Sequence, residues 1–213
     1  ARRIAEHERV VDAAIAANVE RIVYTSILSA SPNATFTLAR DHYATEQYIV
    51  ASGLAHAFLQ NGFYAEMLPL MVSAAGVIAG PGGKGAFAPV SRDDVADVAA
   101  IVLRDPGTSG HTYRLTGPAA ITFDEAAAIL TRVTGRTVRY ENETIEEAYA
   151  SRASFRAPKF EVDAWVSTYT AIAEGDFASV SGDVPALLGR PAASLEDVLS
   201  FYPASYAHIG ATS

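Results

Sequence analysis

The sequence predicts an α/β fold built on a doubly wound parallel sheet, with a smaller α/β region toward the C-terminus. Two observations support this fold. Helical and strand patterns alternate with short connections over the first 62 residues, as they do when helices pack on both faces of one sheet. The first two strand patterns are also apolar through their centres, which is typical of parallel strands covered on both faces.

The first four expected elements are a helix, a strand, a helix and a strand. Apolar residues keep helical spacing in both helices, and in the second helix His42 and Thr45 share one stripe with Leu38 and Ile49. The two strands are short apolar or aromatic runs. The expected ranges are 2–17, 21–26, 38 to the Ser52-Gly53 stop, and 56–60.

Shorter elements are expected beyond residue 75. A strand and a glycine-rich turn over 76–90 lead to Ser91, which together with Asp94 has the spacing of a capping box at a helix start. A strand over 112–115 opens a second small α/β unit, whose helix has a capping box at its start. The remaining expected elements are a helix over 122–133, a strand over 137–140, and helices over 145–152, 160–173, 185–188 and 195–201.

The composition excludes several classes of protein. The 213 residues include 16 Lys and Arg against 24 Asp and Glu, a net charge of −8, which argues against nucleic-acid binding because phosphate contacts need clustered basic residues. No run of 18 apolar residues occurs, so no membrane span is expected. The absence of cysteine and of a readable signal peptide predicts a cytoplasmic protein. Because the chain begins on Ala1 inside a helical pattern, we expect a fragment of a longer protein.

One glycine-rich segment, residues 80–85, matches the dinucleotide pattern G-x-G-x-x-G. That pattern binds a pyrophosphate only where a helix begins on it, so that the helix amides and dipole meet the phosphates. The residues that follow Gly85 read as extended up to Ser91. We therefore interpret this segment as an ordinary turn. A P-loop is excluded as well, because Ile78 stands where it needs glycine.

Three other chemistries are excluded by spacing. The five histidines never fall at metal-ligand spacing, so no metal is expected. No G-x-S-x-G segment offers an esterase nucleophile. No tyrosine lies four residues before a lysine, because Gly80 and Phe155 precede Lys84 and Lys159 at that distance. Any reductase chemistry would therefore need a different proton donor.

Polar and aromatic side chains gather where two expected strands end. Residues 24–26 finish the first strand and residues 61–64 follow the second, and ligands of open α/β sheets bind beyond the carboxyl ends of the strands. Between them, His42 and Glu46 lie one helical turn apart, and an imidazole exchanges a proton readily near neutral pH. Two interpretations stay open for this pair, a catalytic role and a solvated helix face.

Seven stretches, spread over nearly the whole chain, carry a family likeness: HERVVDAA (7–14), IVYTS (22–26), DHYATE (41–46), LQNGFYAE (59–66), VSRDDVA (90–96), TFDEAA (122–127) and SGDVPALLG (181–189). They resemble, in family order, the NmrA-like branch of the atypical short-chain dehydrogenase/reductases, and especially its bacterial NAD(P)H quinone oxidoreductase and triphenylmethane reductase group. Together they are specific, although each alone is weak.

This resemblance implies the C-terminal half of an NAD(P)-binding Rossmann-like domain over residues 1–116 and a smaller substrate domain, interleaved with it, over residues 117–213. It implies hydride transfer from NADPH or NADH to a quinone-like or dye-like acceptor. Isoflavone-reductase-type relatives carry a catalytic lysine at the position of His42, so the resemblance assigns His42, with Tyr64 as the other candidate, to orienting the acceptor or giving a proton. The residues implied to line the nicotinamide side are Thr25, Ser26, Asn61, Gly62 and Phe63.

The sequence departs from the family at its start. The family begins with a strand and a G-x-x-G-x-x-G turn that binds the pyrophosphate, and roughly the first four strands have no counterpart here. We therefore expect the activity to belong to a longer parent protein and this chain alone to be inactive. Two rival interpretations are an NmrA-type redox-sensing regulator, which binds a dinucleotide and a protein partner without turnover, and a structural remnant without a ligand. The choice between NADH and NADPH, the acceptor and the oligomeric state stay open.

Overall fold

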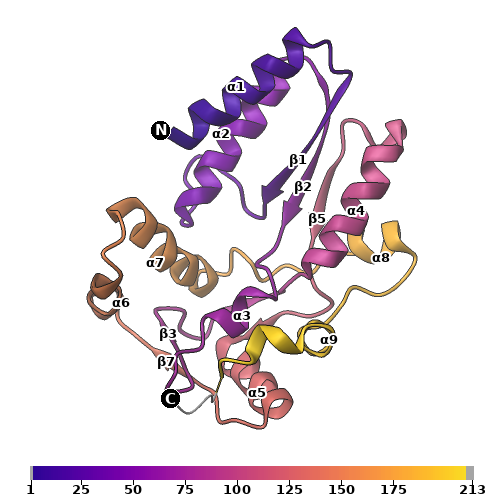
Figure 1. The fold of residues 1–213 in the computed structure, drawn as a ribbon. Helices are drawn as coiled ribbons and strands as arrows, with labels where there is room; N and C mark the ends of the chain where they lie inside the picture. The colour runs from indigo at the N-terminus through magenta and orange to yellow at the C-terminus, as the bar shows by residue number, and fades with distance from the viewer. Residues whose placement is uncertain (1, 210–213) are drawn as a thin grey trace.

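The structure is a computed structural model that describes residues 2–209, and Figure 1 shows its fold. Its α-helices are α1 (Arg2–Ala16), α2 (Thr37–Ala51), α3 (Met67–Leu70), α4 (Arg92–Arg104), α5 (Phe123–Thr134), α6 (Ile145–Arg152), α7 (Lys159–Ala173), α8 (Asp183–Leu188) and α9 (Leu195–Phe201). Its strands are β1 (Arg21–Ile27), β2 (Ala55–Asn61), β3 (Val77–Gly80), β4 (Ala86–Phe87), β5 (Thr112–Leu115), β6 (Ile121–Thr122) and β7 (Arg139–Asn142). Short 3-10 helices are η1 (Pro106–Thr108), η2 (Ala153–Phe155) and η3 (Pro203–Tyr206). No helix in the described range is long and apolar enough to cross a membrane.

Three parallel strands form the main sheet in the order β1-β2-β5. Arg21 lies opposite Ala55 at one end of the β1–β2 pair, and Ile27 lies opposite Asn61 at the other. Helices α1 and α2 lie on one side of the sheet and α4 lies on the other (Figure 1). This arrangement confirms the predicted α/β fold with a doubly wound parallel sheet.

The side chains of β2 show why these strands are apolar through their centres. Leu59 packs in a cluster with Val98 of α4, whereas Phe58 packs with Val11 of α1 and Ile49 of α2. Successive side chains of a strand point to opposite faces. A strand with helices on both sides therefore has no solvated position in its middle.

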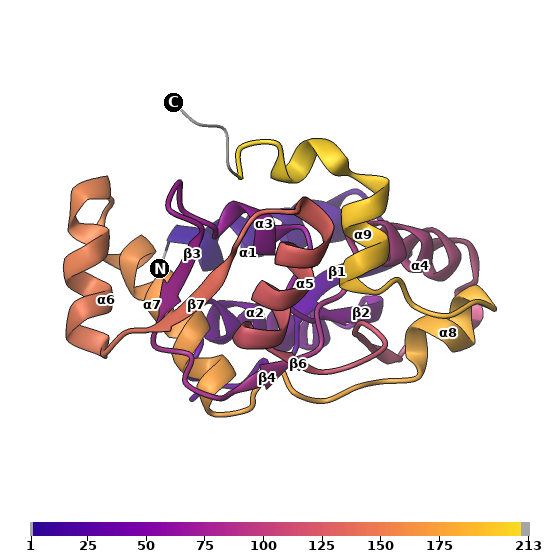
Figure 2. The ribbon, with the colours of Figure 1, turned by 90° about the horizontal axis from the view of Figure 1, so that it is seen from below.

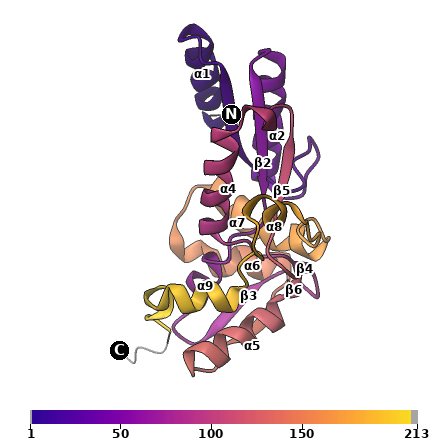
Figure 3. The same cartoon turned by 90° about the vertical axis from the view of Figure 1, so that its right-hand side faces the viewer.

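The second region of the molecule is built around its own core. There β3 pairs with β7 in parallel and β4 pairs with β6 in antiparallel orientation. Helix α5 lies beside β7 and β6 (Figure 2), and Figure 3 shows α1 and α2 at one end of the molecule and α5 and α9 at the other. The core buries Phe87, Phe123, Leu130 and Ile172. Because β3 and β4 pair with strands that follow residue 116, the chain passes between the two regions more than once, and the domain division at residue 116 stays a prediction.

Two local predictions are wrong. Residues 112–115 do not open a separate α/β unit, because β5 pairs with β2 and completes the main sheet. Ser91 does cap α4, by accepting a hydrogen bond from the Asp93 amide, but Asp94 forms no capping box with it. The Asp94 carboxylate is buried and accepts hydrogen bonds from Arg190 Nη1 and from the Ala193 amide, each at 2.7 Å. Local spacing cannot reveal partners that lie so far along the chain.

Candidate functional site

The residues expected at the strand ends meet at one edge of the main sheet. Ser26 in β1 lies opposite Gln60 in β2, and Ile27 lies opposite Asn61. Thr25 is exposed, whereas the exposed fractions of Ser26 and Asn61 are only 4% and 2%. This is the carboxyl edge, where open α/β sheets bind their ligands.

Two buried polar atoms at this edge have no hydrogen-bond partner among the described residues, namely Ser26 Oγ and Asn61 Oδ1. An unpaired buried polar group costs about 1–3 kcal/mol of stability. The Asn61 side chain is held in place, because its Nδ2 donates to the Tyr64 hydroxyl at 2.9 Å. Ser26 Oγ and Asn61 Oδ1 therefore each keep an unused hydrogen-bonding capacity.

Gly62 and Phe63 shape the loop that follows β2. The Gly62 amide donates to the Leu115 carbonyl at 2.8 Å, and a Cβ on Gly62 would lie 3.0 Å from the Ala88 carbonyl oxygen. The close approach of these backbone segments explains the glycine. Phe63 turns toward the second core, where its ring meets that of Phe87 edge-on at a centroid distance of 5.5 Å.

Tyr64 lies on the α4 side of the main sheet. Its ring packs against the cluster of buried side chains that contains Val90 and Val95, and the Arg92 guanidinium carbon lies 5.0 Å from the ring centroid. Its hydroxyl accepts the hydrogen bond from Asn61 and keeps its own proton for another partner. The structure therefore joins Tyr64 to the strand edge through Asn61.

His42 lies on the opposite side of the sheet, on the inner face of α2. It belongs to a cluster of side chains from three elements. His42 Nδ1 lies 2.7 Å from the hydroxyl of Tyr24 in β1, and this hydroxyl lies 3.5 Å from Nδ1 of His7 in α1. His7 Nδ1 lies 2.8 Å from Thr45 Oγ1. We call His7, Tyr24, His42 and Thr45 the histidine cluster. Because α2 and α4 cover opposite faces (Figure 1), the structure does not bring His42 and Tyr64 together.

The surroundings of His42 keep its imidazole uncharged at neutral pH. Burial is the largest cause that lowers the pKa of His42 to about 4, with smaller contributions in the same direction from Arg3 and His7 and an opposing one from Asp41. A group with this pKa is protonated in roughly one molecule in a thousand at pH 7. Burial also raises the pKa of Tyr24. His42 is thus a neutral hydrogen-bonding group, and not the imidazolium acid that its residue type suggests.

Glu46 does not pair with His42. Its exposed fraction is 6%, and it accepts a hydrogen bond from Gln60 Nε2 at 3.1 Å. Glu46 lies one turn further along α2 than His42, and its carboxylate therefore contacts β2 and not Tyr24. The two side chains therefore form neither an acid–base pair with each other nor a solvated helix face.

Sequence reasoning placed Tyr24 at the strand end, within residues 24–26, but assigned neither Tyr24 nor His7 to the candidate site. Tyr24 lies one position before the predicted Thr25, and the alternation of a strand turns it to the α2 face. The available signal was a tyrosine inside an otherwise apolar strand, next to a helix that carries a histidine on its inner stripe. His7 gave no comparable signal, because its neighbours in α1 read as an ordinary amphipathic helix.

The glycine-rich turn over residues 80–85 is a structural feature. Strand β4 follows it, and no helix begins there, which confirms the rejection of the dinucleotide pattern. The Gly82 amide donates to the Tyr140 hydroxyl at 2.8 Å. A Cβ on Gly85 would lie 2.1 Å from the Ile172 carbonyl oxygen. Close packing against α7 therefore explains why residue 85 is a glycine.

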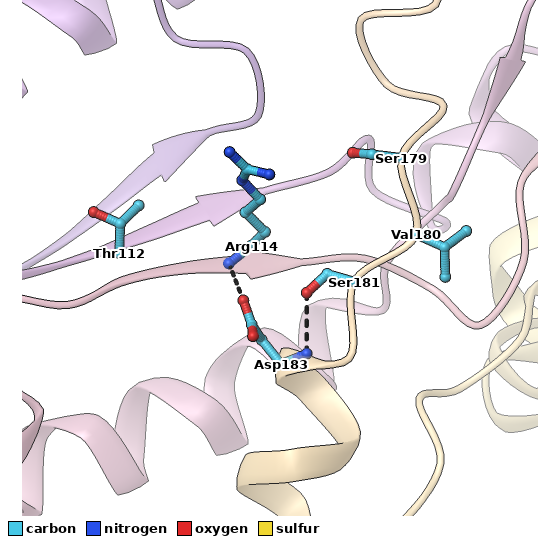
Figure 4. Close-up of a pocket in the computed structure, with 6 residues that line it drawn as sticks. All are labelled: Thr112, Arg114, Ser179, Val180, Ser181 and Asp183. Atoms are coloured by element: carbon cyan, nitrogen blue, oxygen red, sulfur yellow. Dashed lines mark hydrogen bonds between the residues drawn. The ribbon is translucent and has the colours of Figure 1, made fainter.

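A cavity of about 400 Å³ opens beside the edge strand β5 (Figure 4). Asp183 Oδ2 accepts a hydrogen bond from the Arg114 amide at 2.7 Å, and Ser181 Oγ accepts one from the Asp183 amide at 3.0 Å. These bonds hold the start of α8 on β5, and none of the predicted site residues lines this cavity. Across the part of the chain that the structure describes, no three acidic or histidine side chains are arranged to hold a metal ion.

Comparison with known proteins shows the family to which the chain is similar. The model of the NmrA-like family matches residues 1–160. The chain is 33% identical over 201 residues to quinone oxidoreductase 2 of Escherichia coli strain K12, an alignment that covers 93% of this chain and 70% of that protein. It is 31% identical over 200 residues to an NAD(P)H azoreductase of Xenophilus azovorans, with 92% of this chain and 70% of that protein covered.

Solved structures show the same likeness. The crystal structure of the NADPH-dependent quinone oxidoreductase QOR2 from E. coli, complexed with NADPH, matches with a TM-score of 0.83 and 32% identity, covering 92% of this chain and 70% of that chain. The triphenylmethane reductase of a Citrobacter species, complexed with NADP(H), matches with a TM-score of 0.81 and 31% identity, covering 93% and 70%. The described sheet is therefore the parallel sheet of a Rossmann-like reductase.

Proposed function

Because the chain belongs to the NmrA-like family, we propose that it forms the nicotinamide-side part of an NAD(P)H-dependent oxidoreductase that reduces quinone-like or dye-like acceptors. Its relatives support this reaction class, since one is named a quinone oxidoreductase and another an azoreductase. Two solved relatives are complexes with NADPH or NADP(H). Such a cofactor, when bound, supplies the hydride.

The observation that carries this proposal is the pair of unpartnered atoms at the strand edge. A nicotinamide carboxamide has one amide donor group and one carbonyl acceptor. Asn61 Oδ1 can accept from the amide. Ser26 shares a face with Gln60 and not with Asn61, so its hydroxyl can donate to another part of the cofactor or to the acceptor, and each of the two buried atoms without partners offers one hydrogen bond. In the proposal Thr25, Gly62 and Phe63 complete the nicotinamide side.

We propose that either His42 or Tyr64 orients the acceptor or gives it a proton. His42 is neutral at pH 7, and its Nε2 is the ring nitrogen that does not face Tyr24, so it can hydrogen-bond an acceptor oxygen. The Tyr64 hydroxyl accepts from Asn61 and can donate its proton. Because the two residues lie on different faces of the sheet, single substitutions at each can separate their contributions.

The proposal includes a limit on the chain by itself. Dinucleotide affinity in this fold comes largely from a glycine-rich turn whose following helix directs its amides at the pyrophosphate. Among the described residues, the one turn of that pattern is followed by β4. We therefore propose that the 213-residue chain alone binds NADPH or NADH weakly and does not turn over.

The proposed partner is a small-molecule acceptor, and the proposed location is the cytoplasm. A net charge of −8 disfavours a nucleic acid as partner. A chain without cysteine has no need of an oxidising compartment.

The test is NADPH and NADH oxidation by the product of the complete reading frame, with a panel of quinones and azo dyes as acceptors. Turnover well above the rate without protein supports the proposal. Cofactor binding without turnover on any acceptor would contradict it and indicate a redox-sensing regulator instead. A variant with Asn61→Leu, in which the edge loses an acceptor, should lose cofactor affinity, whereas Asn33→Leu, in the exposed loop before α2, should not.

A further inference from the structure

In the histidine cluster, each hydrogen-bonding contact needs one proton, and each hydroxyl or neutral imidazole has only one to donate. The contacts therefore restrict where the protons lie. The four groups come from α1, β1 and α2. His7 contacts both Thr45 and Tyr24, and Tyr24 in turn contacts His42. We propose that His7 is a positioning residue, which fixes the direction of the hydrogen bond between Tyr24 and His42 so that His42 presents an Nε2–H donor.

The Thr45 hydroxyl has one proton, and it donates that proton to the Asp41 carbonyl at 2.9 Å. A carbonyl oxygen can only accept. The contact of 2.8 Å between Thr45 Oγ1 and His7 Nδ1 then needs its proton from the imidazole. His7 is therefore the Nδ1–H tautomer, with Thr45 as its acceptor.

This tautomer decides what Tyr24 can do. A protonated His7 Nδ1 has no lone pair to accept from the Tyr24 hydroxyl, which lies 3.5 Å away. The Tyr24 proton therefore goes to His42 Nδ1 at 2.7 Å. A neutral His42 that accepts at Nδ1 carries its own proton on Nε2.

The charged and titratable groups around His42 act together with this arrangement. On α1 they are Arg3 and His7, on β1 Tyr24, and on α2 Asp41 and Glu46. Burial is the largest cause that keeps the imidazole neutral, and the Arg3 guanidinium acts in the same direction. The consequence for catalysis rests on the proposed function. In it, His42 polarises an acceptor oxygen through Nε2–H and does not act as an imidazolium acid.

The direct test reads the tautomers in the 213-residue chain labelled with ¹⁵N-histidine, at pH 7, by two-bond proton–nitrogen correlation. We expect the Nδ1–H pattern for His7 and the Nε2–H pattern for His42. Because free imidazole side chains favour Nε2–H, the result for His7 is the sharper one. An Nε2–H pattern for His7, or an Nδ1–H pattern for His42, would overturn the proposal.

A matched pair of variants tests the cause. Thr45→Val removes the acceptor, so His7 should change to Nε2–H, whereas Thr45→Ser keeps the acceptor and should keep Nδ1–H. If His7 stays Nδ1–H in folded Thr45→Val, the proposal is wrong. If that variant does not fold, His7→Leu and His7→Asn replace it. The asparagine amide can donate to Thr45 and should keep the Nε2–H pattern of His42, whereas leucine should lose it, and the same His42 pattern in both variants contradicts the proposal.

These measurements need no turnover, so they separate the two hypotheses. If the tautomers are as expected but the complete gene product does not oxidise NADPH, this inference is supported and the proposed function is contradicted. Turnover with the opposite tautomers would remove this inference and leave the proposed function standing.

Discussion

Two parts of the molecule carry features of a dinucleotide site, the strand edge at Ser26 and Asn61 and the glycine-rich turn over residues 80–85. They differ in what their polar groups already bind. At the strand edge, Ser26 Oγ and Asn61 Oδ1 are buried and have no partner among the described residues. In the turn, the Gly82 and Gly83 amides donate to Tyr140 Oη and Asn142 Oδ1, each at 2.8 Å.

The difference shows that a match in letters is weaker evidence than the state of the hydrogen-bonding groups. The glycines of the turn allow close contact between packed segments, because a Cβ on Gly80 or Gly82 would meet the rings of Tyr169 or Phe123 at 2.4 and 2.7 Å. The strand edge matches no glycine motif, yet it alone of the two has polar atoms left for a ligand.

The largest effect is expected from Gly85→Ala in the turn. The new Cβ would lie 2.1 Å from the Ile172 carbonyl oxygen, which is backbone and cannot turn away. We expect a loss of about 3 kcal/mol or more in the free energy of unfolding, measured with urea.

Gly182→Ala is the matched control, because nothing lies within 4 Å of its Cβ and its φ is −87°. It should change the free energy of unfolding by less than about 0.5 kcal/mol. A Gly85→Ala protein as stable as this control would mean that residue 85 is not a packing glycine and would reopen a ligand role for the turn.

His42→Ala should lower kcat of the complete gene product by about 100-fold, which is the effect of losing one well-placed hydrogen-bond donor. The KM for the cofactor should stay within about threefold, because His42 lies on the inner face of α2 and is not expected to reach the pyrophosphate. Gln47→Ala, on the exposed side of the same helix, should leave kcat unchanged. A loss smaller than threefold at His42 would leave Tyr64 as the better candidate.

The low pKa of His42 predicts a pH dependence of stability. In the unfolded chain the imidazole takes up a proton as the pH falls below its ordinary pKa of 6.5, whereas in the folded chain it does so only near pH 4. Acid therefore favours unfolding across this window, by about 3 kcal/mol in total, and the stability is recovered as the pH rises above 6.5. Urea titrations should show this slope in the wild-type chain and a flatter one in His42→Gln, and equal slopes would show that His42 is not buried as described.

A smaller effect is expected from Ser26→Ala. Removing an unpartnered hydroxyl should leave the free energy of unfolding unchanged or slightly higher, while the affinity of the complete gene product for the cofactor falls about tenfold. Ser205→Ala is the control, because Ser205 Oγ is also buried without a partner but lies in η3, away from the strand edge. Equal cofactor affinities in the two variants would show that the Ser26 hydroxyl does not bind the cofactor.

Much of the fold could be predicted because its signals are local. Helical spacing, short apolar strands and the Thr122–Glu125 capping box depend on neighbours within a few residues, and the structure confirms them. The wrong predictions involve partners far along the chain. Asp94 has the spacing of a capping box but bonds Arg190, and the strand over 112–115 looked separate because pairing with β2 leaves no mark in the sequence.

The candidate site divides in the same way. The strand ends at Ser26 and Asn61 could be predicted, because parallel strands end at one edge, and the family resemblance that the comparisons confirm pointed to His42. The meeting of His7 with His42 could not be predicted, since it depends on how α1 packs on α2. The roles of these residues stay predictions until the variants above are measured.

The most direct test of the central claim is a titration of the ¹⁵N-labelled 213-residue chain with NADPH, followed by amide shifts. The account predicts shifts at Ser26, Asn61 and Gly62, none at residues 80–85, and a Kd weaker than about 100 μM, or ~5.5 kcal/mol, because the chain alone has no described surface for the pyrophosphate. Shifts centred on residues 80–85 with a Kd tighter than about 100 μM would contradict it and would make the glycine-rich turn the cofactor site.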